Sequence, residues 1–244
     1  MDARGPGAEV GFGGFYKVRF QLNDAVGRSV MHAHDGKMLG GNSAFAHIGT
    51  YEESGDDVSV VVRTVRHNPD PNYPAMAGTD DATLVAQGRP NGDTYRFEGG
   101  LREVPGVPFQ ALLTPIEEQA VPIAGGVGEG GIANGLYSIH LRLLDGVSGG
   151  LTGVMLLKDG RIVGGDAFFY YLGTYVSENG RWKGQILNQE HTPARGENPI
   201  FGGHEVGIGF SGTCNEEGAV LEATALAGKR SLRLTAVLKL MRRL

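Results

Sequence analysis

The chain has 244 residues, 41 of them glycine, a formal net charge of −5 and a pI near 5.8. An acidic chain lacks the broad basic surface needed to grip nucleic acid or an anionic membrane, and one cysteine excludes an internal disulfide. The sequence opens without a signal-peptide pattern and contains no apolar run long enough to span a membrane. We therefore expect a soluble, cytoplasmic protein with no membrane and no direct nucleic-acid partner.

The chain begins with a glycine-rich stretch, residues 1–13, which predicts a loose N-terminal arm. The next segment alternates apolar with polar residues, the pattern of a β-strand with one solvated face. Its apolar positions are Tyr16, Val18, Phe20 and Leu22. Further strands are predicted at residues 58–65, 95–98, 110–114, 154–157, 161–163, 183–187 and 220–225 and, on the alternation of leucines and alanine, at 232–240.

Turn dipeptides of the Asp-Gly and Asn-Gly type separate many of these strands, because Asn, Asp and Gly tolerate the positive φ of tight hairpin turns. They begin at Asp35, Asn91, Asp145, Asp159 and Asn179. Many short strands joined by such turns indicate antiparallel β-structure. The aromatic residues Phe45, Tyr51, Phe169 and Tyr175 are expected in its core rather than in a ligand box.

His32 and His34 lie on one face of a strand, a spacing that some metal sites use. Such a site needs further ligands, and the matching positions later in the chain are Leu156 and Lys158. We interpret the pair as surface or pocket-lining histidines and expect no metal and no cofactor.

A cluster of carboxylates follows, in "YEESGDD". Glu52, Glu53, Asp56 and Asp57 flank a Ser-Gly turn, so we expect them at a hairpin tip, either as a solvated turn or as a partner-binding site. The matching later segment, "YVSENGR", keeps only Glu178.

Two further histidines, His67 and His191, occupy matching places two residues before a proline. A shared functional group is one interpretation. We favour the other, that each bonds the backbone where a strand ends and so fixes a loop.

The matching segments are parts of one long internal repeat. "AHDGKMLGGNSAFAHIGTY" from Ala33 is repeated as "LKDGRIVGGDAFFYYLGTY" from Leu157, and "GFYKVRFQLND" as "GLYSIHLRLLD". The glycine-rich residues 119–133 between the copies are predicted to be a flexible linker. We therefore expect two homologous β domains, at 14–118 and 134–244.

Catalytic signatures are weak. No G-x-S-x-G elbow is present, and a G-x-G-x-x-G match beginning at Gly126 lies in the linker without a βαβ unit around it. Cys214 lacks the neighbours of a nucleophile. We expect a protein that is not an enzyme.

The repeat resembles the GrlR-type negative regulators of type III secretion, whose chains open with a G-x-Y-x-I strand and carry a glycine turn followed by a G-G-D segment. The second copy matches at Gly135, Tyr137, Ile139, Gly160, Gly164, Gly165, Asp166 and Gly173, and the first has Asn42 in place of Asp166. The resemblance covers roughly the first half of each domain.

This resemblance implies small closed antiparallel β-barrels of lipocalin-like shape, with about eight strands each, packed as a pseudo-dimer within one chain. It implies a regulatory protein that sequesters a transcription activator through the acidic loop after Tyr51 or Tyr175. The partner-binding candidates are then Glu52, Glu53, Asp56, Asp57 and Glu178. The alternative is a lipocalin-like binder of a small apolar molecule.

Overall fold

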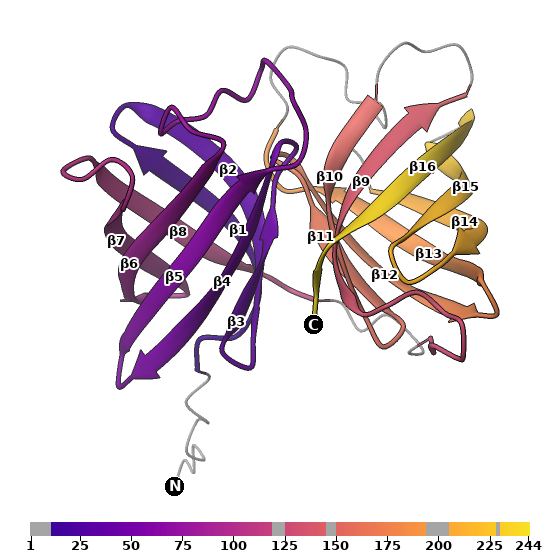
Figure 1. Cartoon of the computed structure of the whole chain (residues 1–244), viewed down its shortest axis with the longest axis horizontal. Coiled ribbons are helices and arrows are strands. Elements are labelled where there is room, and N and C mark those ends of the chain that lie inside the picture. The colour runs from indigo at the N-terminus through magenta and orange to yellow at the C-terminus, as the bar shows by residue number, and fades with distance from the viewer. Residues whose placement is uncertain (1–10, 119–124, 145–149, 194–204, 228–229) are drawn as a thin grey trace, which may run out of the picture.

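The computed structural model describes residues 11–118, 125–144, 150–193, 205–227 and 230–244. It consists of two closed antiparallel barrels of eight strands each, packed side by side (Figure 1). The prediction of tandem all-β barrels is confirmed. Within the described part of the chain, no helix has the length and apolar character required to cross a membrane.

Barrel 1 runs through strands β1 to β8 in sequence order and closes by pairing β1 with β8. Its strands are β1 (Gly14–Leu22), β2 (Ala25–His34), β3 (Lys37–Gly41), β4 (Phe45–Ser54), β5 (Asp57–Arg66), β6 (Asp81–Asn91), β7 (Thr94–Leu101) and β8 (Pro108–Ile116).

Barrel 2 repeats this topology and closes by pairing β9 with β16. Its strands are β9 (Gly135–Leu143), β10 (Gly150–Lys158), β11 (Arg161–Gly165), β12 (Phe169–Glu178), β13 (Arg181–Glu190), β14 (Val206–Cys214), β15 (Gly218–Ala227) and β16 (Arg230–Arg243).

Three of the predicted turn dipeptides join successive strands as expected, whereas the one predicted at Asn91 lies one residue further on, because Asn91 still pairs with Thr94. Asp35, Asp159 and Asn179 have φ values of 49°, 48° and 51°, and the glycine after each is also at positive φ. These are the dihedrals that two-residue hairpin turns require. The turn predicted at Asp145 lies outside the described residues.

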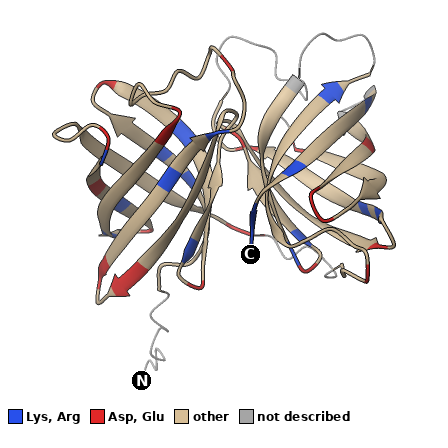
Figure 2. Cartoon of the chain, in the orientation of Figure 1, with Lys and Arg blue, Asp and Glu red and all other residues tan. Residues whose placement is uncertain are grey.

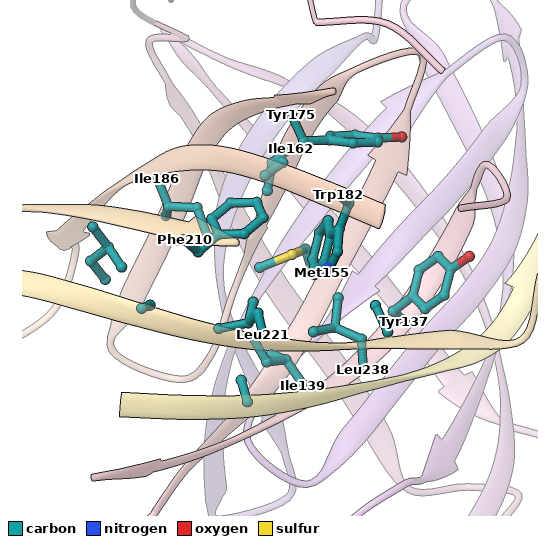
Figure 3. Packing of buried hydrophobic residues seen from close by; sticks show 14 of the residues in the cluster. Tyr137, Ile139, Met155, Ile162, Tyr175, Trp182, Ile186, Phe210, Leu221 and Leu238 are labelled. Carbon is teal, nitrogen blue, oxygen red and sulfur yellow. The ribbon is translucent and has the colours of Figure 1, made fainter. Parts of the chain in front are cut away.

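Alternate side chains of every strand fill the barrel interiors, because successive residues of a strand point to opposite faces. The barrel 2 core includes Tyr137, Met155, Tyr175 and Trp182, each at most 2% exposed (Figure 3). The barrel 1 core is built around Phe12, Tyr16, Met31 and Phe97, with Val58, Val60 and Val62 from β5. Of the predicted core aromatics, Phe45, Phe169 and Tyr175 are buried and Tyr51 is half-buried.

A third apolar cluster lies between the barrels, where β2 and β3 face β10 and β11. Its buried members are Phe15, Val30, Leu39, Ala46, Leu136, Val154, Leu156, Val163 and Leu172. These side chains point outward from their own barrels, so the two barrels bury them only by packing together.

The packing between the barrels is reciprocal. Gly41 faces Val154, and a Cβ on Gly41 would lie 2.8 Å from the valine Cγ1. The repeat-related pair makes the same contact: a Cβ on Gly165 would lie 3.0 Å from Cγ1 of Val30. Such an exchange of matching contacts is the mark of an approximate two-fold axis.

The structure corrects two of the sequence expectations for the segments that precede the barrels. Residues 11–13 of the predicted loose arm are packed, and Phe12 is 1% exposed inside barrel 1. Residues 125–133 of the predicted flexible linker run along barrel 2, where Val127 pairs with Ser177, and Ile132 is fully buried. In both cases an apolar side chain in a glycine-rich segment gains more from burial than the segment loses in conformational freedom. Residues 1–10 and 119–124 lie outside the described part.

Candidate functional site

The carboxylates predicted at a hairpin tip lie where β4 turns into β5, at the lower end of barrel 1 in the view of Figure 2. The register pairs Ser54 with Asp57 and leaves Gly55 and Asp56 as the turn. Gly55 has φ 60°, a value that favours glycine. Glu52, Glu53 and Asp56 are exposed and Asp57 is half-buried.

Two of these four carboxylates already have partners within the chain. Asp57 accepts a hydrogen bond of 2.5 Å from Nε of Arg89 on β6, and this bond lowers the pKa of the carboxyl group. Glu53 Oε2 accepts a hydrogen bond of 2.8 Å from the backbone N–H of Phe12. Glu52 and Asp56 are therefore the members of the tip best placed to meet a partner.

The matching tip of barrel 2 differs in chemistry. Glu178 is exposed at the end of β12, next to Gly128. The residue that matches Glu53 is Ser177, whose Oγ accepts a hydrogen bond of 2.7 Å from the Ile132 N–H. Each tip thus bonds the segment that precedes its own barrel, at Phe12 or at Ile132. Of the two described tips, that of barrel 1 carries the cluster of carboxylates.

His67 and His191 bond the backbone at matching positions, as expected. His67 Nε2 lies 3.0 Å from the carbonyl oxygen of Asn42, and His191 Nε2 lies 3.4 Å from that of Asp166. A ring nitrogen that faces a carbonyl oxygen must carry the proton, so Nδ1 of a neutral His67 is unprotonated. This Nδ1 has no hydrogen-bond partner among the described residues. Burial lowers the pKa of both rings, to about 4 for His191.

His32 and His34 lie next to each other, with ring centroids 5.9 Å apart. The groups around His32 disfavour a bound metal ion. Burial, the neighbouring His34 and the positive charges of Lys158 and Arg161 lower the pKa of His32 to about 4. His34 pairs with Asp35 at 3.0 Å. Nowhere in the described ranges do three His, Cys, Asp or Glu side chains gather as they would around a metal ion.

We accordingly predict that protein purified without a tag holds far less than one metal ion per chain. Elemental analysis by mass spectrometry after gel filtration measures this. Stoichiometric zinc, nickel or iron that disappears in the His32→Ala, His34→Ala double variant would contradict the prediction.

A buried polar pair in barrel 2 was not anticipated from the sequence. Asp166 accepts hydrogen bonds from the N–H groups of Phe168 and Phe169 at 2.7 and 2.8 Å, and from the Tyr171 hydroxyl at 2.9 Å. Burial raises the pKa of Asp166, and burial together with the Asp166 carboxyl raises that of Tyr171. Asn42, at the matching position, accepts the same two backbone bonds, so this side chain shapes the turn before β4 or β12.

An open groove of about 680 Å³ lies on barrel 2. Its lining includes residues 127, 128 and 130–134, together with Asp159, Cys214, Glu216 and Arg243. The Cys214 thiol lies 3.4 Å from Ser177 Oγ at this groove.

No protein-family model matches this chain, and neither does any curated protein. Among solved structures, that of a putative outer membrane protein from Bacteroides fragilis shares 10% sequence identity with it. The match covers 93% of this chain and 96% of that one, with a TM-score of 0.24. A likeness of this size leaves function to be argued from the residues themselves.

Proposed function

We propose that the protein is a cytoplasmic, non-enzymatic regulator that captures a basic protein, of the transcription-activator type, through the acidic tip of barrel 1. The observation that carries the proposal is the unequal use of the four tip carboxylates. Glu53 and Asp57 each accept a hydrogen bond from another part of barrel 1, whereas Glu52 and Asp56 are exposed on the hairpin between β4 and β5. Exposed carboxylates on a fixed tip attract a basic surface and set its orientation.

The filled interiors support binding at an outer surface over chemistry inside a barrel. Aromatic and aliphatic side chains occupy the cores of both barrels, and Trp182 packs on Phe210 with ring centroids 4.5 Å apart. A lipocalin-like binder of an apolar molecule remains the second candidate. It requires one of these packed side chains to move.

The double variant Glu52→Gln, Asp56→Asn tests capture by the tip. We expect unchanged thermal stability, because exposed charges contribute little to folding. A partner isolated from native cells and then purified will bind at least tenfold more weakly to this variant, since two attractive charges are lost. Its affinity for the wild type will fall as salt rises from 0.05 to 0.5 M, because salt screens such attraction.

The matched control is Asp24→Asn, Glu217→Gln, which removes the same charge from exposed positions elsewhere. Glu53 and Asp57 are left intact so that Phe12 and Arg89 keep their partners. Equal affinity of the tip variant and the control for the purified partner, measured by calorimetry, would overturn the proposal.

A further inference from the structure

The ring of Phe12 occupies an aromatic site inside barrel 1. Four rings surround it, at centroid distances of 4.9 Å for Tyr95, 5.0 Å for Tyr51, 5.4 Å for Tyr16 and 5.6 Å for Phe97. Tyr51 and Tyr95 meet it edge to face and Tyr16 is stacked, the arrangements that aromatic pairs prefer. The site therefore fits one planar aromatic group.

The segment that carries Phe12 is held by few bonds. Its N–H donates to Glu53, and the Gly13 carbonyl oxygen accepts a bond of 2.9 Å from the Tyr16 hydroxyl. Gly14 has φ 117°, a conformation that favours glycine, and Gly11 lets Glu53 approach, because a Cβ there would lie 2.9 Å from its Oε2. Glycines on both sides of Phe12 make this segment easy to bend.

Barrel 2 provides an internal comparison. Ile132 lies fully buried at the corresponding place, and its N–H bonds Ser177. The residues before it are fixed by four backbone hydrogen bonds of 2.7 to 2.9 Å between residues 126–130 and residues 177–180. No such backbone ladder involves residues 11–13 within the described chain. The same insertion is thus fastened in barrel 2 and lightly held in barrel 1.

We propose that the Phe12 site is a binding site for a small planar aromatic molecule, and that Phe12 is its intramolecular occupant. Such a molecule enters when residues 11–13 swing away about Gly14, and its ring takes the place of the phenyl ring among Tyr16, Tyr51, Tyr95 and Phe97. No described residue accepts from or donates to the Tyr51 and Tyr95 hydroxyls, so these can bond a polar group on the ligand, such as an indole N–H or a phenol hydroxyl.

This inference is independent of protein capture by the acidic tip. The variant that tests the tip leaves Glu53 and Phe12 unchanged. Failure of either proposal therefore leaves the other standing.

The experiment is a titration of the full chain with indole, followed by calorimetry and by amide NMR. We expect wild-type protein to bind indole weakly, with shifts at residues 11–14 and around Tyr51 and Tyr95. Phe12→Ala removes the competing ring and will bind indole at least tenfold more tightly, since the apparent affinity of a site scales with the fraction of it that is open. Ile132→Ala, the matched truncation in barrel 2, will show the wild-type affinity.

Glu53→Ala provides a second route that keeps the Phe12 ring, in case Phe12→Ala fails to fold. Loss of the carboxylate loosens residues 11–13, so we expect several-fold tighter indole binding than in Glu52→Ala, its control on the same hairpin. Three results would overturn the proposal. They are no binding of indole to the wild type up to its solubility limit, shifts confined to barrel 2, and equal binding of the aliphatic probe cyclohexanol.

Discussion

Replacing Val154 with Asp will separate the two barrels while leaving each of them folded. Val154 is fully buried, yet it points away from its own core and into the cluster between the barrels, against Gly41. A carboxylate buried there without a partner costs on the order of 3–5 kcal/mol. The cost falls on the contact between the barrels, because the interior of barrel 2 is not changed.

A protease site placed between residues 118 and 125 makes the separation measurable by gel filtration. After cleavage, the wild-type halves will elute together and the Val154→Asp halves will elute apart, each with a β-sheet circular dichroism spectrum. Val176→Asp on the exposed face of β12, where the valine is 43% exposed, is the control and will elute as the wild type. Co-elution of the Val154→Asp halves, or separation of the wild-type halves, would refute the packing described above.

The free energy of unfolding will fall as the pH is lowered from about 6.5 to about 4. Burial is the main cause that holds the pKa values of His32, His47 and His191 at about 4 in the folded protein, below the usual 6.5. Between these two pH values the unfolded chain binds protons that the folded chain does not, so acid favours unfolding. The loss is complete below pH 4, where both states are protonated.

His47 gives the clearest measurement, because it is 7% exposed inside barrel 1, with Nδ1 3.0 Å from Thr64 Oγ1. A ring with a pKa of about 4 accounts for about 2 kcal/mol of the stability lost between pH 7 and pH 5. Urea unfolding at both pH values will therefore show a smaller loss for His47→Gln than for the wild type. His34→Gln, at an exposed position, is the control, and an unchanged pH dependence in His47→Gln would contradict the assignment.

Strands with clear alternation and bounded by Asp-Gly or Asn-Gly were predictable, because the hairpin is a local structure. Strand β6 was missed, since Gly88 and Pro90 are residues that usually weaken or end a strand. The structure gives the reason for the glycine: the Phe97 ring of β7 lies over it, and a Cβ on Gly88 would come within 2.4 Å of that ring. Strand β14 alternates Val206, Ile208 and Phe210 with smaller residues, a pattern that an inspection for period two would have found.

The candidate site was predictable in its position and not in its internal bonds. A Ser-Gly turn between carboxylates indicated a hairpin tip, and the structure has one there. The pairing of Asp57 with Arg89 and of Glu53 with the Phe12 N–H joins residues that are 32 and 41 positions apart. Such pairs follow from barrel closure, which a local pattern does not encode. For the same reason "GFGG" predicted a loose arm although its phenylalanine is buried.

The reciprocal contacts of Gly41 with Val154 and of Gly165 with Val30 have a consequence for how this protein can change over time. In an assembly of two identical chains, one gene encodes both sides of the axis. Every mutation therefore changes the same residue in both subunits. Here each side has its own codon. Around the axis the halves have already drifted apart: His67 lies edge to face with His140, whereas His191 faces the charges of Lys17 and Arg28. Mutations in one barrel can therefore change what that barrel binds while the other barrel keeps its sequence and its side of the contact.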